Sequence, residues 1–411
     1  MDVFNHHKSS KIIAYFVTTV LIFYIIANFL PFKLYNYFFI LLLLISLPFL
    51  TFPLNNPIKN ENKFLLSLPI FFMIVLLSSY LNKVPIAEID TYTRFVLCIP
   101  IYFLLRNISV SIKLFCYGLI ISSILAGSLS LYDYYILNLA RAGHISSIVI
   151  TYGNMCMTLF ILMLVCLRFH EYLKINKNIM YVALIMSLLG WLLTFTRGSL
   201  IGLLVCTPFL FSTTFSKNIK AKLIVFVVIS IMILSTPMKN RISTIINDLS
   251  QINYNQIEKS TVNVSLKERL IYIDVALRAI KEKPLIGIGL DGFADYIEKE
   301  YDNIDFTIAD HAHNDFFDIF SKTGIFGLIS LIYLFFISIY YFVFYFKYSS
   351  NKLKIYASMG IVTCLSQIGF MLTQSQLSHH QATLFFVTLL LLTASQVSYL
   401  VRFKSDDDKG Y

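Results

Sequence analysis

The chain has 411 residues, of which 57% are hydrophobic and only 14% are charged, and its mean hydropathy is +0.72. Soluble globular domains carry about 25% charged residues, so this composition excludes a soluble domain and predicts a polytopic membrane protein. The net charge of +10 does not by itself indicate nucleic-acid binding, because it follows from an uneven distribution of lysine and arginine between loops.

Twelve apolar runs are each long enough to cross about 30 Å of hydrocarbon. They cover residues 12–31, 34–53, 64–82, 95–112, 114–132, 147–167, 179–196, 198–215, 222–238, 325–346, 355–375 and 382–401. A bilayer offers no water to unpaired backbone groups, so the predicted fold class is an all-α polytopic bundle of about 12 transmembrane helices. The fourth run is the weakest, because it contains Pro100 and is interrupted by Arg106. The first run lacks a small-residue cleavage site and is expected to be a retained helix.

Lysine and arginine are concentrated on one side of this predicted topology. With the N-terminus placed in the cytoplasm, the inner segments hold 18 of these residues and the short outer loops hold 5. The positive-inside rule therefore predicts that both termini are cytoplasmic. The same bias explains the net charge, so no nucleic-acid partner is expected. All six cysteines fall in predicted helices, which gives no sign of a disulfide framework or of zinc-type spacing.

The predicted spans divide the chain into three parts. Residues 1–238 hold helices 1–9, residues 239–324 form a large outer loop, and residues 325–411 hold helices 10–12 and a cytoplasmic tail. A loop of this length in a compact protein is usually functional or disordered. Here a capping box at 265–268 and apolar residues at helical spacing predict an amphipathic helix over 266–282. Arg269 lies in its first turn, either as a surface arginine or facing an anionic ligand.

The stretch Gly287-Ile-Gly-Leu-Asp-Gly292 follows this helix and formally matches the dinucleotide-binding pattern GxGxxG. That fingerprint requires a preceding strand and a surrounding βαβ unit. Here a helix and Pro284 precede it, so we interpret it as a glycine-rich turn that reverses the chain.

Arg197 stands in the short connection Thr194-Phe-Thr-Arg-Gly-Ser199 between two apolar runs. The connection is too short to place Arg197 in bulk water, and burying arginine near a membrane boundary has a cost. The positive-inside bias also disfavours arginine on this face. A snorkelling boundary residue is one reading, and a residue that binds an anionic ligand is the other, because guanidinium binds phosphate through a planar fork.

The large loop ends in His311-Ala-His-Asn-Asp-Phe-Phe-Asp318, directly before an apolar run. A group that titrates near neutrality at a membrane boundary suits general-base chemistry on a lipid-linked substrate. An interfacial pair of histidines without a chemical role is the alternative for His311 and His313. His379 and His380, in the turn before the last run, are expected to be boundary residues.

Three separated features together resemble the O-antigen ligase (WaaL) family of the O-antigen ligase and polymerase superfamily. They are the turn at 196–198 with Arg197, the early-helix Arg269, and the motif His311-Ala-His313-Asn314 followed by Gly324-Ile-Phe-Gly327. They occur in the order and on the side that the family shows, and the predicted twelve-helix layout agrees. The family's essential positions map onto Arg197, Arg269 and His313. The resemblance also implies a GT-C-like glycosyltransferase architecture.

The resemblance implies transfer of O-antigen polysaccharide from undecaprenyl diphosphate to the lipid A-core at the periplasmic side of a Gram-negative inner membrane. His313 would be the general base, Arg197 and Arg269 would act on the diphosphate, and His311 and Asn314 would contact substrate. Asn314 or Asp315 could orient the imidazole. The outer loop has no Asp-x-Asp motif and the donor carries its own leaving group, so inverting transfer without metal, ATP or cofactor is expected.

Two alternatives remain at this point. An O-antigen polymerase would share the helices, the loop and the arginines, but would use a growing lipid-linked glycan as its acceptor. A twelve-helix transporter belongs to a different class and would be expected to show related halves and charged or broken helices near mid-membrane. In this chain the conspicuous polar residues gather at one predicted face, which favours a transferase.

Overall fold

The computed structural model describes residues 7–51, 56–214, 264–300 and 309–403, and the regular elements in these ranges are helices. The α-helices are α1 (His7–Ala27), α2 (Tyr35–Ser46), α3 (Glu61–Leu81), α4 (Ile86–Ile89), α5 (Arg94–Leu97), α6 (Ile99–Arg106), α7 (Ile112–Leu131), α8 (Val149–Arg168), α9 (His170–Leu173), α10 (Lys177–Leu192), α11 (Ser199–Phe209), α14 (Val264–Glu282), α15 (Gly292–Glu300), α16 (Asp315–Phe346), α17 (Asn351–Met371) and α18 (His380–Arg402). The 3-10 turns are η1 (Leu47–Thr51), η2 (Asp90–Thr93) and η6 (Gln376–Ser378), and π turns extend α7 and α11. The predicted all-α class is confirmed.

Six of the described helices are long and apolar enough to cross a membrane, namely α3, α7, α8, α16, α17 and α18. Shorter apolar helices coincide with four further predicted runs, in α1, α2, α10 and α11. The ninth predicted run, 222–238, lies outside the described residues. The number of twelve spans therefore stays a prediction.

The fourth predicted run, 95–112, does not form one continuous helix. It is divided into α5 and α6 at Cys98, and α6 ends at Arg106. An eight-residue helix rises only about 12 Å, which is too short to cross a bilayer alone. The two features that weaken this run in the sequence lie at the two ends of α6: Pro100 stands in its first turn, and Arg106 is its last residue, where its side chain binds Glu61 of α3.

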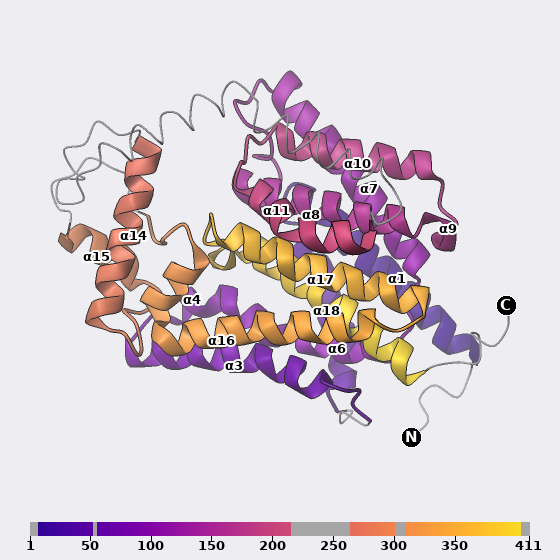
Figure 1. Cartoon of the computed structure of the whole chain (residues 1–411), viewed down its shortest axis with the longest axis horizontal. Coiled ribbons are helices and arrows are strands. Elements are labelled where there is room, and N and C mark those ends of the chain that lie inside the picture. The colour runs from indigo at the N-terminus through magenta and orange to yellow at the C-terminus, as the bar shows by residue number, and fades with distance from the viewer. Residues whose placement is uncertain (1–6, 52–55, 215–263, 301–308, 404–411) are drawn as a thin grey trace.

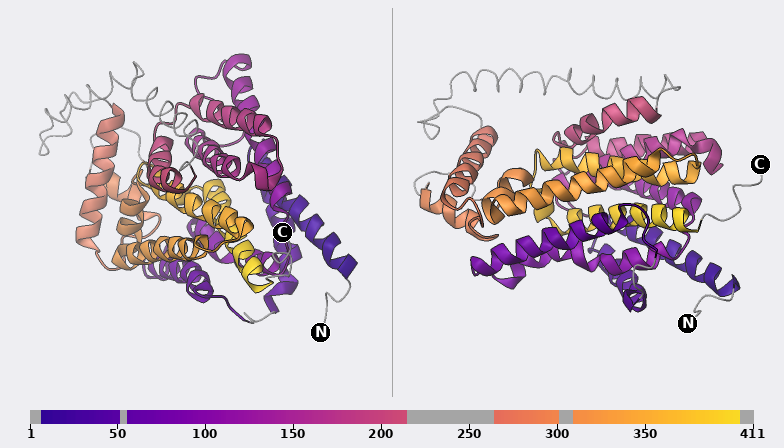
Figure 2. Two further views of the ribbon diagram at one scale, coloured as in Figure 1. Left: turned by 45° about the vertical axis from the view of Figure 1, so that its right-hand side comes forward. Right: turned by 60° about the horizontal axis from the view of Figure 1, so that its bottom comes forward.

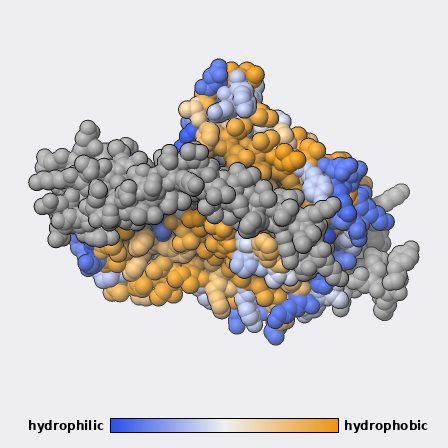
Figure 3. Space-filling view, turned by 45° about the horizontal axis from the view of Figure 1, so that its top comes forward, coloured by the Kyte–Doolittle hydropathy of each residue, from blue (hydrophilic) through white to orange (hydrophobic). Residues whose placement is uncertain are grey.

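The helices form an elongated bundle (Figure 1). α16 lies alongside α3 and α17, α17 packs on α18, α11 and α8, and α10 packs on α7 and α8. Figure 2 shows the same arrangement from two further directions, with α17 and α18 between the other helices. In the space-filling view of Figure 3, most of the described surface of the bundle is apolar, and hydrophilic residues gather toward its edges. This surface suits a protein whose helices are surrounded by lipid.

The two ends of the bundle differ in what they hold. α14, α15 and the start of α16 lie at one end, which we call the α14 end, whereas the start of α1 and the end of α18 lie at the opposite end (Figure 1). The predicted outer loops meet at the α14 end: the Ser146 hydroxyl donates to the Phe29 carbonyl, and the Gln381 amide donates to the Asn28 carbonyl. The loops that the sequence places on one side are thus neighbours in space.

A buried ion pair fixes the opposite end. Glu61 is fully buried, and its carboxylate accepts hydrogen bonds from the Arg106 guanidinium, from the Tyr102 hydroxyl at 2.7 Å and from the Ser398 hydroxyl at 2.7 Å. Removing one partner of a buried pair typically costs about 3–5 kcal/mol, because the other charge is left uncompensated. Arg106, which interrupts an apolar run in the sequence, therefore ties α3, α6 and α18 together.

The described part of the large loop has its own small core. α14 and α15 pack against each other through a cluster that includes Ile271, Val275, Phe293 and Ala312. α14 covers 264–282, which confirms the amphipathic helix predicted over 266–282. Residues 283–291 between the two helices are a turn, as the interpretation of the glycine-rich stretch predicted.

This turn packs backbone to backbone against a break in α16. Gly324 has a φ of +71° inside α16, where helical geometry is lost. A Cβ at Gly324 would clash with the Leu285 backbone, and one at Gly287, whose φ is also +71°, would clash with the Lys322 backbone. Glycine is needed at both positions because only glycine adopts this conformation at such close approach without strain. The break also explains why the apolar run begins at 325 while α16 begins at Asp315.

Candidate active site

Asn314 begins α16 as its N-cap residue. Its side-chain oxygen accepts hydrogen bonds from the backbone N–H groups of Phe316 at 3.0 Å and Phe317 at 3.2 Å. This is the usual way in which an asparagine satisfies the free donors of a first helical turn. The amide nitrogen of Asn314 donates to the Leu372 carbonyl at 3.0 Å, so the cap also ties the start of α16 to the end of α17.

The residues 372–379 between α17 and α18 form what we call the 372–379 turn, and Asp315 holds this turn against α16. Asp315 is fully buried, and its carboxylate accepts the backbone N–H groups of Gln376 at 2.7 Å and Leu377 at 3.1 Å. A carboxylate bound in this way fixes the turn relative to the segment 311–314, although the two are about 60 residues apart in the chain.

Asp318 anchors the segment 311–314, which carries His311 and His313. Its carboxylate is buried and accepts the Ala312 N–H at 3.0 Å and the Ser378 hydroxyl at 3.2 Å. Lys322, one helical turn further along α16, pairs with Asp318 at 3.1 Å and donates to the Asp310 carbonyl at 2.7 Å. The charge of Lys322 is thereby balanced, and the backbone on both sides of the histidines is held.

His313 has a left-handed backbone conformation, with a φ of +52°. A non-glycine residue in such a conformation typically costs about 1–3 kcal/mol, and the surrounding anchors hold it there. Its Nδ1 lies 2.8 Å from Oε1 of Gln374, and its ring lies 5.4 Å from that of Tyr272 on α14. Burial lowers the pKa of His313 below 6.5, and the neighbouring His311 and Arg269 add to this shift. The imidazole is therefore neutral near pH 7, as a general base must be.

Gln374 lies at the centre of a cluster of three histidines. Its amide nitrogen donates to Nε2 of His379 at 3.0 Å and to Nε2 of His311 at 3.4 Å, while its oxygen faces His313. Nδ1 of His311 binds the carboxylate of Asp310. Burial lowers the pKa of His379 to about 4, so this histidine is also neutral near pH 7. Gln374 itself is almost fully buried.

Arg269 lies on α14, close to His313. It is exposed, and its charge is near enough to lower the pKa of His313. Tyr272, nearly one turn further along the same helix, packs on the His313 ring and is buried. α14 therefore brings a cation from the large loop to the histidine cluster.

Arg197 lies in the connection between α10 and α11, and its side chain is half-buried. The indole N–H of Trp191 donates to the Thr196 carbonyl at 2.7 Å, which fixes the connection on α10. A Cβ at Gly198 would clash with the side chain of Thr373, so this backbone lies directly against the 372–379 turn. Thr373 precedes Gln374, and the connection that carries Arg197 is thus a neighbour of the histidine cluster.

A buried row of hydrogen-bonded polar side chains also holds the start of α11 against the 372–379 turn. The Ser199 hydroxyl donates to the Asn154 side chain at 2.6 Å, and the Asn154 amide donates to the Gln376 side chain at 2.9 Å. The starts of α8 and α11 are thereby joined to the 372–379 turn. Arg141 adds a second arginine here, since its guanidinium donates to the Thr194 carbonyl at 2.8 Å.

The structure brings together the residues that the sequence singled out. Arg269, His311, His313 and Asn314 lie near one another around the start of α16, and the connection that carries Arg197 packs against Thr373 of the 372–379 turn. The two residues expected to orient the imidazole do not contact it in the described structure, because Asn314 caps α16 and Asp315 binds backbone.

Gln374, rather than Asn314 or Asp315, forms the hydrogen bond to the His313 ring, and no local sequence pattern identifies it. His379 was expected to be a boundary residue, but it belongs to the cluster. Its position in a predicted outer loop was the one signal that could have found it. His380 binds Arg94 instead, at 3.1 Å.

Residues 182–332 match the family model described as O-Antigen ligase. The resemblance to the O-antigen ligase family is confirmed. The matched region runs from α10 into α16 and so contains Arg197, Arg269, His311 and His313, while the 372–379 turn lies beyond it. A protein of Haemophilus influenzae, described as uncharacterized, is 28% identical over 372 residues, which are 87% of this chain and 92% of that protein.

The match over residues 182–332 and the apolar helices together support a multi-pass membrane protein that is similar to the O-antigen ligase family. Members of such a family act on lipid-linked polysaccharides. The match therefore implies a membrane protein with lipid-linked polysaccharide substrates.

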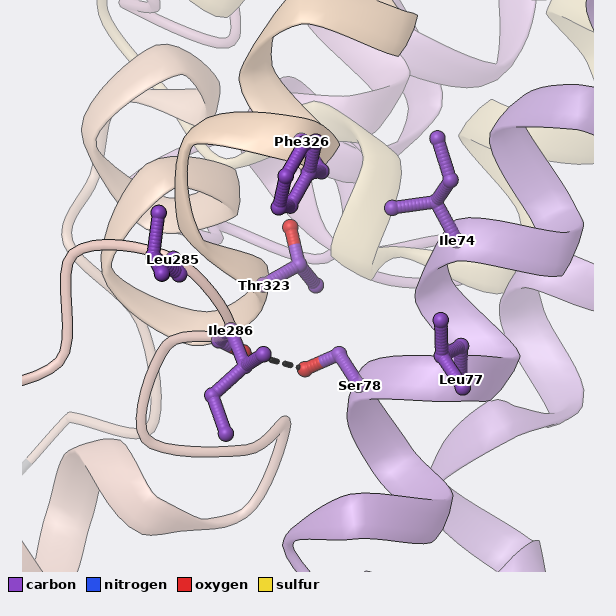
Figure 4. Close-up of a pocket in the computed structure, with 7 residues that line it drawn as sticks. All are labelled: Ile74, Leu77, Ser78, Leu285, Ile286, Thr323 and Phe326. Carbon is purple, nitrogen blue, oxygen red and sulfur yellow. Dashed lines mark hydrogen bonds between the residues drawn. The ribbon is translucent and has the colours of Figure 1, made fainter.

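An apolar cavity of about 240 Å³ lies on the outside of the bundle beside this O-antigen ligase region. It lies between α3, the turn after α14 and the break in α16, with Leu77, Leu285 and Phe326 on its walls (Figure 4). The Ser78 hydroxyl donates to the Ile286 carbonyl at 2.7 Å across its floor. The exposed apolar side chains around it suit contact with lipid rather than with water.

Within the described ranges, no group of three His, Cys, Asp or Glu side chains is arranged to hold a metal ion. Metal independence, the absence of a cofactor and the roles given to individual residues are predictions that this geometry does not test.

Proposed function

We propose that this protein is an O-antigen ligase, a GT-C-like inverting glycosyltransferase that moves O-antigen polysaccharide from undecaprenyl diphosphate to the lipid A-core. The observation that carries the proposal is a neutral, half-buried histidine near Arg269, hydrogen-bonded to a turn whose Thr373 packs against Gly198, the residue after Arg197. Glycosyl transfer to a hydroxyl needs a base and a stabilised leaving group, and a neutral histidine and arginines are side chains that can supply them.

His313 takes the proton of the acceptor hydroxyl. The acceptor oxygen forms its bond to the anomeric carbon while the bond between that carbon and the diphosphate oxygen breaks, and undecaprenyl diphosphate leaves with the electron pair. Attack from the face opposite the diphosphate inverts the anomeric configuration. The lowered pKa of His313 supports this role, since a base must be unprotonated before it reacts.

Arg269 and Arg197 bind the diphosphate and stabilise its developing charge. A guanidinium presents two parallel donors to phosphate oxygens and remains charged throughout the reaction. Arg269 is exposed and Arg197 is half-buried, so both can face a ligand at the membrane boundary. Two fixed cations would supply the stabilisation that other glycosyltransferases obtain from a metal ion.

The site end of the bundle is proposed to face the periplasm. The site lies at the α14 end, whereas the start of α1 and the end of α18, which the topology prediction places on the cytoplasmic side, lie at the opposite end of the bundle. This sidedness places the termini in the cytoplasm. The apolar cavity near the same end offers lipid-facing surface close to the region where a polyprenyl carrier would present its diphosphate.

The proposal is tested by the fate of O-antigen in a deletion strain. A ligase predicts lipid A-core that carries no O-antigen, together with full-length polymer that remains on undecaprenyl diphosphate. A polymerase predicts instead core that carries at most a single repeat unit, and no long polymer on the carrier. Purified protein should also transfer polymer in excess chelator and without ATP, and dependence on an added divalent ion would give the leaving-group role to a metal.

A further inference from the structure

Gln374 connects the imidazoles of His311, His313 and His379 through a single amide. The positions of the protons in this cluster follow from the pair that Asp310 and His311 form. The carboxylate of Asp310 binds Nδ1 of His311, which holds the pKa of that carboxyl well below its usual range. The carboxylate is therefore ionised and can only accept, so Nδ1 of His311 carries the proton. In neutral His311 the other nitrogen, Nε2, is left as an acceptor.

The amide of Gln374 then has only one orientation in which its donors and its acceptor match the hydrogen-bonding atoms of the three histidines. Its nitrogen has two N–H groups, and these face the Nε2 atoms of His311 and His379 at 3.4 Å and 3.0 Å. Its oxygen consequently faces Nδ1 of His313 at 2.8 Å. An amide oxygen only accepts, so Nδ1 of His313 must carry the proton, and Nε2 is the nitrogen left with a free electron pair.

We propose that Gln374 is the positioning residue of the transfer reaction, which holds His313 in the tautomer whose Nε2 accepts a proton, and that the Asp310–His311 pair sets the direction of the Gln374 amide. This rests on the proposed role of His313 as base. Gln374 acts through His313 and does not itself react. Near-complete burial of the amide restricts the side chain to partners in the cluster. The charged groups that act on His313 are Arg269 and Asp318, with His311 as a further titratable neighbour.

The test compares Gln374→Leu and Gln374→Glu in the purified full-length protein, with undecaprenyl diphosphate-linked O-antigen as donor and lipid A-core as acceptor. Leu removes the acceptor, so turnover should fall roughly 10–100-fold, by analogy with the loss of a partner that orients a metal-bound histidine, while KM for the donor stays near the wild-type value. Glu keeps an acceptor and favours imidazolium, so the acidic limb of the rate–pH profile should move to higher pH.

A second measurement reads the tautomer without using activity. The ¹⁵N spectrum of labelled histidine distinguishes protonated from unprotonated ring nitrogens, and the His313 signals are those lost in His313→Ala. Wild type should show a protonated Nδ1 and an unprotonated Nε2, and Gln374→Leu should show a mixture. Gln376→Leu is the matched control, because the side chain of this buried glutamine of the same turn accepts from Asn154 and bonds no histidine among the described residues. Its His313 signals and acidic limb should match wild type.

The outcomes separate the two proposals. Full turnover in His313→Ala would overturn the base assignment of the proposed function. An inactive His313→Ala together with a Gln374→Leu that keeps wild-type turnover and an unmixed His313 spectrum would overturn the positioning role alone. A Gln374→Glu variant that loses as much turnover as Gln374→Leu, with no movement of the acidic limb, would also overturn the positioning role, because the retained acceptor would then have no effect on His313.

Discussion

Replacing His313 by alanine separates chemistry from stability more cleanly than any other single change in this site. The backbone of the histidine segment is held by bonds that do not involve the imidazole, namely Ala312 N–H to Asp318 and the Asn314 cap. The substitution removes the hydrogen bond to Gln374 and leaves a buried amide oxygen without that partner. A loss of this kind costs about 1–3 kcal/mol of stability.

The effect on the reaction should be larger. A general base contributes about 10²–10⁴-fold to a rate, which corresponds to roughly 3–5 kcal/mol of activation free energy. We therefore expect His313→Ala to be present in membranes near the wild-type amount and to bind donor, but to ligate at least 100-fold more slowly. His311→Ala should keep a measurable fraction of activity, because His311 lies beside His313, with ring centroids 4.5 Å apart, but does not take the proton.

The assay is ligation of O-antigen in a deletion strain complemented with each variant, with membrane abundance measured in parallel. His170→Ala is the control, since this histidine lies in α9 at the opposite end of the bundle. Wild-type ligation by His313→Ala with loss in His311→Ala would mean that the base is His311. Activity in both variants would refute any catalytic role for the motif.

Three further predictions concern charge, pH and sidedness. Arg197→Ala and Arg269→Ala should nearly abolish transfer and Arg→Lys should bind donor poorly, because lysine cannot form the planar fork; donor binding and transfer by the lysine variants at wild-type level would contradict this. A base works above its pKa, and the pKa of His313 is lowered from 6.5. In a rate–pH profile, the fall in the rate of wild-type transfer on the acidic side should therefore lie below pH 6.5. A fall above that value would be inconsistent with the site. A reporter that is active only outside the cytoplasm, fused near Asp295 of α15, should be active, and a silent but stable fusion would reverse the topology.

The fold was predictable where composition and local spacing determine it. Ten of the twelve apolar runs carry a helix, and the capping box at the start of α14 places that helix within two residues of its observed start. The prediction of one continuous helix over the fourth run, 95–112, is wrong, and the sequence shows only part of the reason. Pro100 and Arg106 mark it as weak, but the outcome depends on Glu61, which lies 45 residues earlier in the chain and accepts the guanidinium. A local pattern cannot identify such a partner.

The same limit applies to the site, and it explains why the reacting group was easier to predict than its support. His313 stands in a motif whose residues are adjacent in the sequence, and Arg197 stands out because cations are rare in the short predicted outer loops. Arg269 is singled out by its place in the first turn of the predicted helix and by the family resemblance. Gln374 is 61 residues from His313, in a turn of ordinary composition, and nothing distinguishes it from Gln376 until α16, α17 and α18 are packed together. Chemistry-bearing residues are recognisable by type, whereas the residue that orients them is defined only by contact. The positioning role of Gln374 is therefore an inference that required the fold.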